Sequence, residues 1–230
     1  MTAGELLEQY RLDMVDTVTP HFWSDTEAYR YMASAYNMFV RLTGGIADFT
    51  SKATQVDIVV GENVAVIDKS ILRIMEASRG SDTAKIEVIN QANLTFQRDN
   101  DYGRIRQLYT DNTPGPVRYM IIGAERNKVR WVQMPEVADV ANLLIYRLPL
   151  NTIDPLDPDE SFDFSEVEEE HHTHFVLWMR YLGYMKADAD TFDQGKATLF
   201  KAQFEEYCNF TKAEWERYKH KNRSVAYGGL

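Results

Sequence analysis

Apolar residues recur every three or four positions near both ends of the chain, which predicts amphipathic helices there. A first helix is expected over residues 4–16, before Pro20. A second is expected to begin at Ser24, because Ser24 and Glu27 have the spacing of a capping box. Gly44 and Gly45 supply the left-handed residues that commonly end a helix. Together these signals predict an αα-hairpin.

A third and longer helix is expected over residues 165–186, where Ser165 and Glu168 repeat the capping-box spacing. Its apolar face consists of Val167, His171, His174, Leu177, Trp178, Tyr181, Leu182 and Met185. Asp190 with Asp193, and Thr211 with Glu214, predict the starts of a fourth and a fifth helix. The long third helix is thus expected to form the centre of a helical bundle.

The period of the pattern changes from 3.6 to 2 between Thr50 and Leu150, which predicts strands. The expected strands cover residues 56–60, 64–67, 71–77, 85–89, 117–122, 129–134 and 140–147. Turns such as Gly61-Glu-Asn are short, and short turns favour an antiparallel sheet or small sandwich over parallel units. Residues 91–111 are polar and fit either a short helix or an exposed loop.

The predicted fold class is therefore α+β: a bundle of about five helices with an antiparallel β-rich insertion between the N-terminal helix pair and the C-terminal helices. The expected parts are a helical hairpin (1–49), a β-rich insert (50–150), a linker (151–164), C-terminal helices (165–222) and a docking tail (223–230). The linker is assigned from its two prolines and its acidic, aperiodic composition.

Charge narrows the range of functions. The chain has 230 residues, of which 25 are Lys or Arg and 35 are Asp or Glu, so its formal charge is −10. Proteins that grip DNA by its phosphates usually carry the opposite charge, since released counterions supply much of that affinity. We therefore expect no nucleic-acid binding, although an acidic protein can let DNA pass without adhering to it.

The single cysteine, Cys208, excludes an internal disulfide and a Cys-based zinc site. Its place on a helical stripe favours a buried apolar role. The N-terminus lacks a basic region followed by an apolar run, and no long uncharged apolar stretch follows. We therefore expect a soluble protein of a reducing compartment.

The run EVEEEHHTH at 166–174 contains the residues best suited to hold a metal. Glu168 and His171 have the i, i+3 spacing of di-iron bundles, and His172 and His174 lie beside them. Such a site needs a second Glu-x-x-His on another helix, and the sequence has none. Acids at the start of a helix, where they favour the macrodipole, explain the run more simply. No metal and no cofactor are expected.

The sequence contains no phosphate-binding loop and no G-x-S-x-G nucleophile motif. Pairs of acids suited to glycoside cleavage are present in any protein with this many acids, and none stands out. We expect no enzymatic activity.

The chain as a whole resembles the head-to-tail adaptor, or connector, proteins of tailed bacteriophages. The resemblance rests on the order of FWSDTEAYRYMASAYNMFVRLTGGI at 22–46, ILRIMEASR at 71–79, PGPVRYMIIGAERNKVRWVQMP at 114–135, LLIYRLP at 143–149, HFVLWMRYLGYMKADADTFDQGKATLFKAQFEEY at 174–207 and the final RSVAYGGL. Each piece alone is a common helix start or strand edge, and the specificity lies in their order.

The resemblance implies a virion protein with no reaction centre. Identical subunits are expected to form a ring, twelve-fold in this family, beneath the portal protein and above a tail or nozzle protein. The ring would extend the DNA channel and retain the packaged genome, with double-stranded DNA passing through it. The expected location is the head-to-tail interface of the virion, after assembly in the host bacterial cytoplasm.

The last eight residues are basic at first and then rich in glycine, which suits a segment that orders on binding. The resemblance makes them the candidate portal-binding residues: Arg223, Ser224, Val225, Ala226, Tyr227, Gly228, Gly229 and Leu230.

Two alternatives remain open at this point. The protein could be a tail-completion or nozzle component one level below the adaptor. From a different class, it could be a metal-dependent enzyme or a cell-wall hydrolase.

Overall fold

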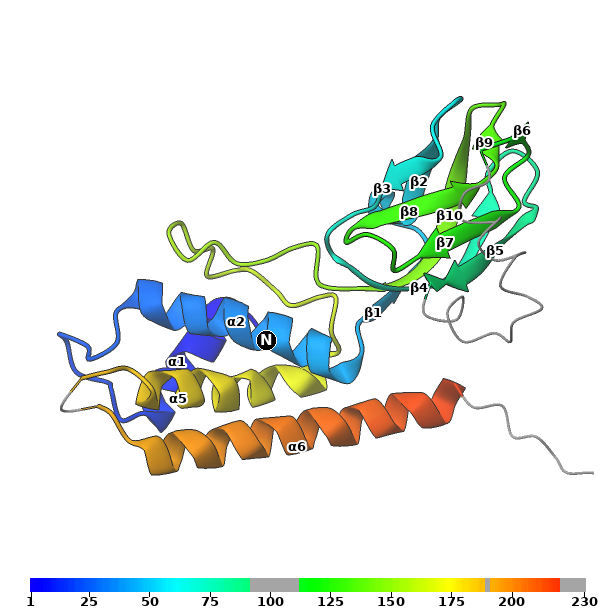
Figure 1. The fold of residues 1–230 in the computed structure, drawn as a ribbon. Coiled ribbons are helices and arrows are strands. Elements are labelled where there is room, and N and C mark those ends of the chain that lie inside the picture. Colours follow the sequence, from blue (N-terminus) through cyan, green and yellow to red (C-terminus); the bar gives the residue numbers. More distant parts are fainter. Residues whose placement is uncertain (92–111, 189–190, 220–230) are drawn as a thin grey trace, which may run out of the picture. The chain divides into compact units, whose positions relative to one another are not determined.

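The computed structural model describes residues 1–91, 112–188 and 191–219 of the chain. These residues form two compact units (Figure 1). Unit 1 combines Met1–Gly44 with Pro149–Leu230, and unit 2 is Gly45–Leu148. The finer division of unit 1 into hairpin, linker, helices and tail stays a prediction.

Unit 1 contains four α-helices among its described residues. They are α1 (Ala3–Asp13), α2 (Asp25–Thr43), α5 (Phe175–Tyr184) and α6 (Gln194–Lys219). The expected capping box of Ser24 and Glu27 is confirmed at the start of α2, and Gly44 ends that helix with a φ of 105°. Helix α1 has a capping box of its own, made by Thr2 and Glu5.

The expected long helix over residues 165–186 is wrong in its first half. Residues 165–168 are not helical, a 3-10 helix, η2, covers Glu169–His174, and the α-helix starts only at Phe175. Glu166 shows one reason, because its carboxylate accepts hydrogen bonds from the backbone N–H groups of Leu150 and Asn151, 3.0 Å away. Glu166, which stands between the two residues of the expected capping box, instead secures the preceding loop.

The expected fourth and fifth helices are a single helix, α6. Thr211 has the sequence spacing of a cap, yet it lies in the middle of α6 and is buried. The buried face continues through it, from Phe204 and Cys208 to Trp215, at steps of three and four. Continuous packing along one face therefore overrides a local capping signal.

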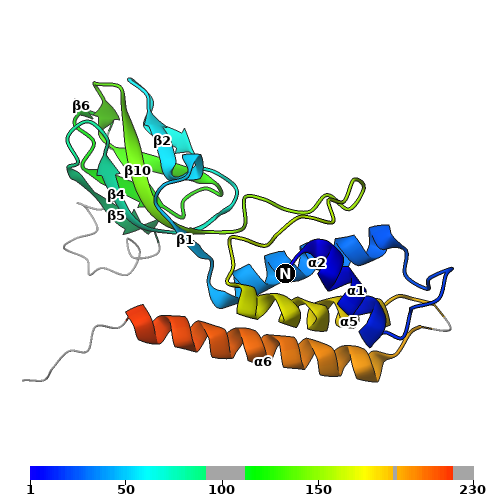
Figure 2. The ribbon, with the colours of Figure 1, turned by 180° about the vertical axis from the view of Figure 1, so that it is seen from behind.

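The core of unit 1 is rich in aromatic side chains and centres on α5, which packs against α1, α2 and α6 (Figure 2). The buried aromatic residues are Tyr10, Trp23, Tyr29, Tyr36, Phe39, Phe164, Phe175, Trp178, Phe200 and Phe204.

Unit 2 is built on a curled eight-stranded sheet, with strands in the order β1-β10-β4-β5-β7-β8-β3 and β2 also paired to β10. The strands are β1 (Ile46–Asp48), β2 (Gln55–Ile58), β3 (Val64–Val66), β4 (Ile71–Arg79), β5 (Lys85–Asn90), β7 (Tyr119–Ile122), β8 (Lys128–Val132) and β10 (Asp139–Arg147). A short 3-10 helix, η1 (Lys52–Thr54), precedes β2, and a two-stranded sheet joins β6 (Pro114–Gly115) to β9 (Met134–Pro135).

The sheet is mixed, so the expected antiparallel arrangement is wrong. Strands β5 and β7 run parallel, with Glu87 opposite Tyr119, and β6 and β9 are also parallel. A parallel pair needs a long connection, and the chain between Asn90 and Tyr119 is long enough. The predicted fold class is corrected accordingly: a large curled mixed sheet is joined to four helices in the described residues, and no five-helix bundle forms there.

Unit 2 has its own core, which includes the fully buried Trp131 of β8. Its buried residues are Val56, Ile58, Ile74, Ala77, Ile86, Val117, Met120, Val129, Trp131, Ala141, Leu143 and Ile145. Among the described residues of both units, none of the helices has the length and apolar content needed to cross a membrane.

Candidate interaction surfaces

The predicted metal candidates lie around η2 and pack as part of the core of unit 1. His171 and His172 are buried, whereas Glu168 is exposed. His171 Nδ1 lies 2.8 Å from the Tyr207 hydroxyl on α6, and His172 Nε2 lies 3.0 Å from the backbone oxygen of Val167. Across the described ranges, no three His, Cys, Asp or Glu side chains are grouped as metal ligands.

His174, at the end of η2, stacks on the Tyr207 ring with a centroid distance of 3.5 Å and an interplanar angle of 14°. Burial lowers the pKa of His174, and the nearby His171 lowers it further. Both effects favour the neutral imidazole. The histidine cluster therefore attaches η2 to α6, and its chemistry is that of packing and hydrogen bonding.

The candidate portal-binding residues Arg223–Leu230 lie outside the described residues, as do Asp190 and residues 92–111. The portal-binding segment follows closely on the C-terminal end of α6 in the sequence.

Three exposed apolar side chains of unit 1 lie on the connection between α1 and α2. We call Val15, Val18 and Phe22 the loop patch; they are 83%, 76% and 61% exposed. Folding buries most large apolar side chains. A group of three exposed ones on one connection is typical of an interaction site.

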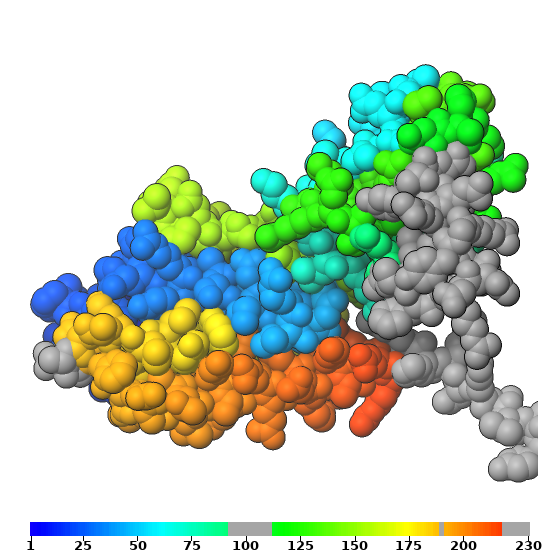
Figure 3. All heavy atoms as spheres, in the orientation of Figure 1, coloured from blue at the N-terminus to red at the C-terminus, as the bar shows by residue number. Residues whose placement is uncertain are grey.

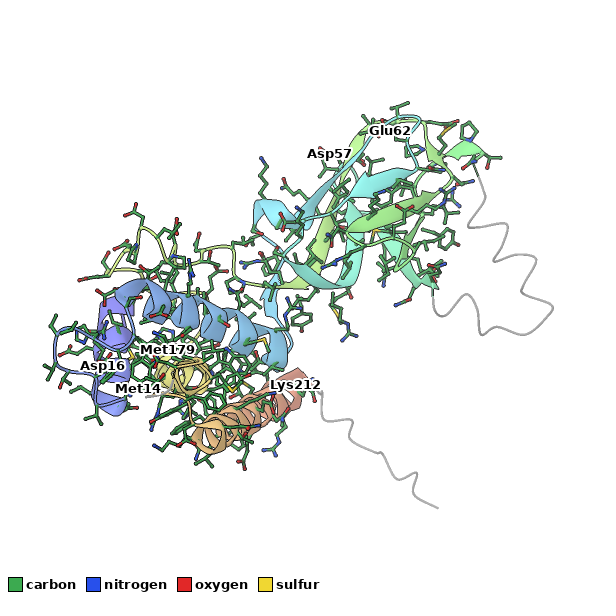
Figure 4. The ribbon with its side chains drawn as sticks, turned by 60° about the vertical axis from the view of Figure 1, so that its left-hand side comes forward. Met14, Asp16, Asp57, Glu62, Met179 and Lys212 are labelled. Carbon is green, nitrogen blue, oxygen red and sulfur yellow. The ribbon has the colours of Figure 1, made fainter. Side chains whose placement is uncertain are left out.

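The backbone beneath the loop patch is held by a buried ion pair. The Arg11 guanidinium donates to the carboxylates of Asp16, at 2.9 Å, and Asp25, at 2.5 Å. Asp16 also accepts hydrogen bonds from the backbone N–H groups of Phe22, at 2.9 Å, and Trp23, at 3.4 Å. Figure 4 labels Asp16 beside Met14, whose side chain is buried. Asp16 thus joins both ends of the loop.

Val15 has a left-handed backbone, with a φ of 57°. This conformation is a genuine outlier for a β-branched residue and persists only where the surroundings impose it. The neighbouring Asp16 provides that constraint, so the loop patch is presented by a fixed backbone.

Two large apolar side chains are exposed on α6, whose outer surface lies open along one side of unit 1 (Figure 3). We call Leu199, Ala202, Glu206, Phe210 and Ala213 the outer face of α6; all five are exposed, and Glu206 places a charge at the middle of the face. Leu199 is 53% exposed and Phe210 is 59% exposed.

Sequence reasoning missed the loop patch. The available signal was a run of large apolar residues, from Leu12 through Val15 and Val18 to Phe22, across a connection that contains Pro20. These residues stand three or four positions apart, as on a helix face, but the predicted helix ends at residue 16 and Pro20 follows, so Val18 and Phe22 are not needed for that face. The outer face of α6 was missed because the helix was expected to break at Thr211.

Charge is divided unequally between the two units. Unit 2 contains 13 Asp and Glu residues and 13 Lys and Arg residues, so its formal charge is zero. Unit 1 contains the other 22 acidic and 12 basic residues, and so carries the whole charge of −10. Nine of its acids, and no Lys or Arg, lie in residues 154–170.

Comparison with known proteins gives the family. A search of curated proteins found no match. A family model described as SU10 adaptor protein matches residues 1–223, which include the described residues of both units. The resemblance to bacteriophage head-to-tail adaptors is thereby confirmed. The chain belongs to the SU10 adaptor protein family, and is a phage adaptor protein and virion component.

Proposed function

We propose that this protein is the head-to-tail adaptor of a tailed bacteriophage, and that twelve copies form a closed ring beneath the portal protein. The ring extends the DNA channel, retains the packaged genome and provides the surface to which the tail or nozzle protein attaches. The observation that carries this proposal is the family match over residues 1–223. Assembly takes place in the host cytoplasm, and the mature location is the head-to-tail interface.

The distribution of charge supports a channel function. Unit 1 holds the entire net charge of −10, and like charges repel the phosphates of a passing duplex. A channel wall of this kind lets DNA slide without specific binding. The role requires no cofactor and no catalytic residue.

Residues 223–230 are the proposed portal-binding segment. They contain Arg223 and the apolar side chains Val225, Tyr227 and Leu230, with two glycines between. A short segment that orders on contact can insert apolar side chains into a partner at an entropic cost that limits its affinity. A ring presents one such segment per subunit, so multivalency would compensate for the weakness of each single contact.

Deletion of residues 223–230 tests this assignment. We expect the shortened protein to fold normally but to lose binding to the portal protein in a pull-down and in electron micrographs of the mixture. The matched control is Leu156→Ala, which alters a side chain that is 77% exposed elsewhere in unit 1 and should leave portal binding intact.

Other results of the deletion would assign the protein to a different position in the virion. If the shortened protein still binds the portal but no longer supports tail attachment, the protein is a tail-completion or nozzle component. If the intact protein neither binds the portal nor forms rings with it, the proposed function is wrong.

A further inference from the structure

Strand β3 ends the path of the large sheet in unit 2, and one of its two edges has no partner among the described strands. We propose that this free edge is the tail-attachment surface, and that it binds an extended, basic segment of the tail or nozzle protein by adding it to the sheet as a further strand. The assignment rests on the proposed adaptor function, and it names the element that carries out one part of it.

The pairing of β3 with β8 determines the direction of its backbone groups. The two strands are antiparallel, and the N–H of Trp131 donates to the backbone oxygen of Asn63 at 2.8 Å. In such a pair, hydrogen-bonded positions alternate with positions whose N–H and C=O point away from the partner strand. Val64 and Val66 are therefore the residues whose backbone groups point outward. They have the two-residue spacing that an added strand requires.

The sheet remains open at this edge. Strand β2 precedes β3 in the chain and lies near it, yet no ladder pairs the two strands. Val66, at the end of β3 away from the connection to β2, has a side chain that is 75% exposed. The edge is therefore accessible to solvent at this end.

The edge also lacks the usual features that prevent strand addition. Edge strands typically carry a lysine, a proline or a bulge, which stops another chain from pairing. Residues 63–67 contain no charge and no proline, and their register with β8 is regular. Because β3 covers only three residues, an added strand gains few backbone hydrogen bonds and needs side-chain contacts as well.

Two exposed carboxylates near this edge favour a basic segment. Asp57 lies on β2 and Glu62 lies on the connection to β3, and both are labelled in Figure 4. Neither carboxylate has a hydrogen-bond or ion-pair partner among the described residues. Basic side chains of an incoming segment would supply the missing charges. The same carboxylates disfavour the phosphates of nucleic acid.

The location of the edge favours the tail over the portal as the partner. Portal binding is proposed for the segment that follows α6, which belongs to unit 1. Tail attachment needs a different surface, and β3 belongs to unit 2. Each partner would thus be bound by a separate unit of the chain.

Proline at position 66 tests the edge in the full-length protein. Val66→Pro removes an outward N–H and leaves the hydrogen bonds to β8 intact, because proline is tolerated on an edge strand where its nitrogen faces away from the ladder. We expect phage particles made with this variant to carry tails at least about tenfold less often, since the added strand loses a hydrogen bond and meets a blocked edge. Electron microscopy counts tailed and tailless particles.

Val66→Thr is the matched control, because it keeps the N–H and the branched shape at the same position. Its particles should carry tails as often as those of the unaltered protein. Val66→Lys should lower the tailed fraction more than Val66→Glu, since only lysine repels a basic segment. Both variants keep the backbone N–H, so this comparison decides the result if Val66→Pro fails to fold. Thermal unfolding and ring counts on the portal protein should show that the other variants fold and assemble.

Three results would overturn the proposal. Normal tails on particles of folded Val66→Pro would exclude the edge as the attachment surface. Loss of rings from a folded variant would assign the edge to a contact between copies or with the portal. Equal losses of tails from Val66→Lys and Val66→Glu would contradict a basic partner. The proposed adaptor function fails separately, if the unaltered protein forms no rings with the portal.

Discussion

Asp48 and Arg147 form a buried ion pair that joins β1 to β10 in unit 2. Burial by itself would raise the pKa of the Asp48 carboxyl. Hydrogen bonds from Ser51, Arg147 and Thr50 outweigh burial and hold that pKa well below its usual range. The carboxylate also accepts from the backbone N–H of Thr50 at 2.9 Å, so one residue secures both the strand and the turn after it.

Asp48→Asn is expected to lower the free energy of unfolding of unit 2 by about 3 kcal/mol, because it removes the charge opposite a buried guanidinium. The pKa of Asp48 is lower in the folded state, so the unfolded chain binds more protons in acid and stability rises with pH. Its contribution is complete above about pH 5 and declines as pH falls through about 4 and below. Thermal unfolding at several pH values measures both effects.

Asp57→Asn is the matched control for Asp48→Asn, because it makes the same chemical change at an exposed site. Asp57 is an exposed carboxylate on the neighbouring strand β2, labelled in Figure 4. Its substitution should change the free energy of unfolding by less than about 0.5 kcal/mol. Equal losses for the two variants, or an unchanged acid response in Asp48→Asn, would contradict the assigned role of the pair.

At the scale of elements, the connection between α1 and α2 is held at both ends by one side chain, that of Asp16. Asp16 accepts from Arg11 and from two backbone N–H groups, and it is nearly inaccessible to water. The strained backbone of Val15 is maintained by these contacts. The connection is therefore an element with one defined conformation despite lacking regular secondary structure.

Asp16→Ala is expected to lower the free energy of unfolding of unit 1 by about 3–5 kcal/mol, because the buried Arg11 guanidinium loses its buried carboxylate partner. Hydrogen exchange should accelerate over residues 14–24 before other parts of unit 1. The measurements are thermal unfolding and hydrogen exchange by mass spectrometry.

Asp13→Ala is the matched control for this element, since Asp13 is an exposed partner of Arg180. Surface ion pairs contribute about 0–1 kcal/mol, so the control should remain close to the unaltered protein. If Asp16→Ala left exchange over residues 14–24 unchanged, the ion pair would not be what fixes the loop.

For the whole molecule, the separation of charge leads to a prediction about DNA. Unit 1 carries −10 and unit 2 is neutral, so neither unit carries the net positive charge that usually accompanies phosphate binding. We expect no binding of a double-stranded oligonucleotide at about 10 µM protein in about 0.1 M salt. Fluorescence anisotropy of a labelled duplex measures this directly.

A repeat of that titration in low salt distinguishes weak, general attraction to DNA from true phosphate binding. Binding that appears only there would reflect weak, general attraction to the minority of basic residues. Binding in moderate salt with a steep salt dependence would contradict the view that DNA passes this protein without adhering.

The sequence by itself determined the local features of this protein. The capping box at Ser24 and Glu27 and the glycine at the end of α2 depend only on residues within a few positions, and both were predictable. The composition also determined the acidic charge and, with the order of motifs, the family. Such features need no knowledge of what lies nearby in space.

Only the tertiary structure decided the remaining features. Local spacing predicted a helix start at Ser165 and a break at Thr211, but Glu166 bonds the preceding loop and Thr211 lies on a continuous buried face. The parallel pairing of β5 with β7 and the ion pair between Arg11 and Asp25 likewise join segments that lie apart in the sequence. Short-range preferences are worth fractions of a kcal/mol per residue, so burial of a shared face and pairing of buried charges overrule them.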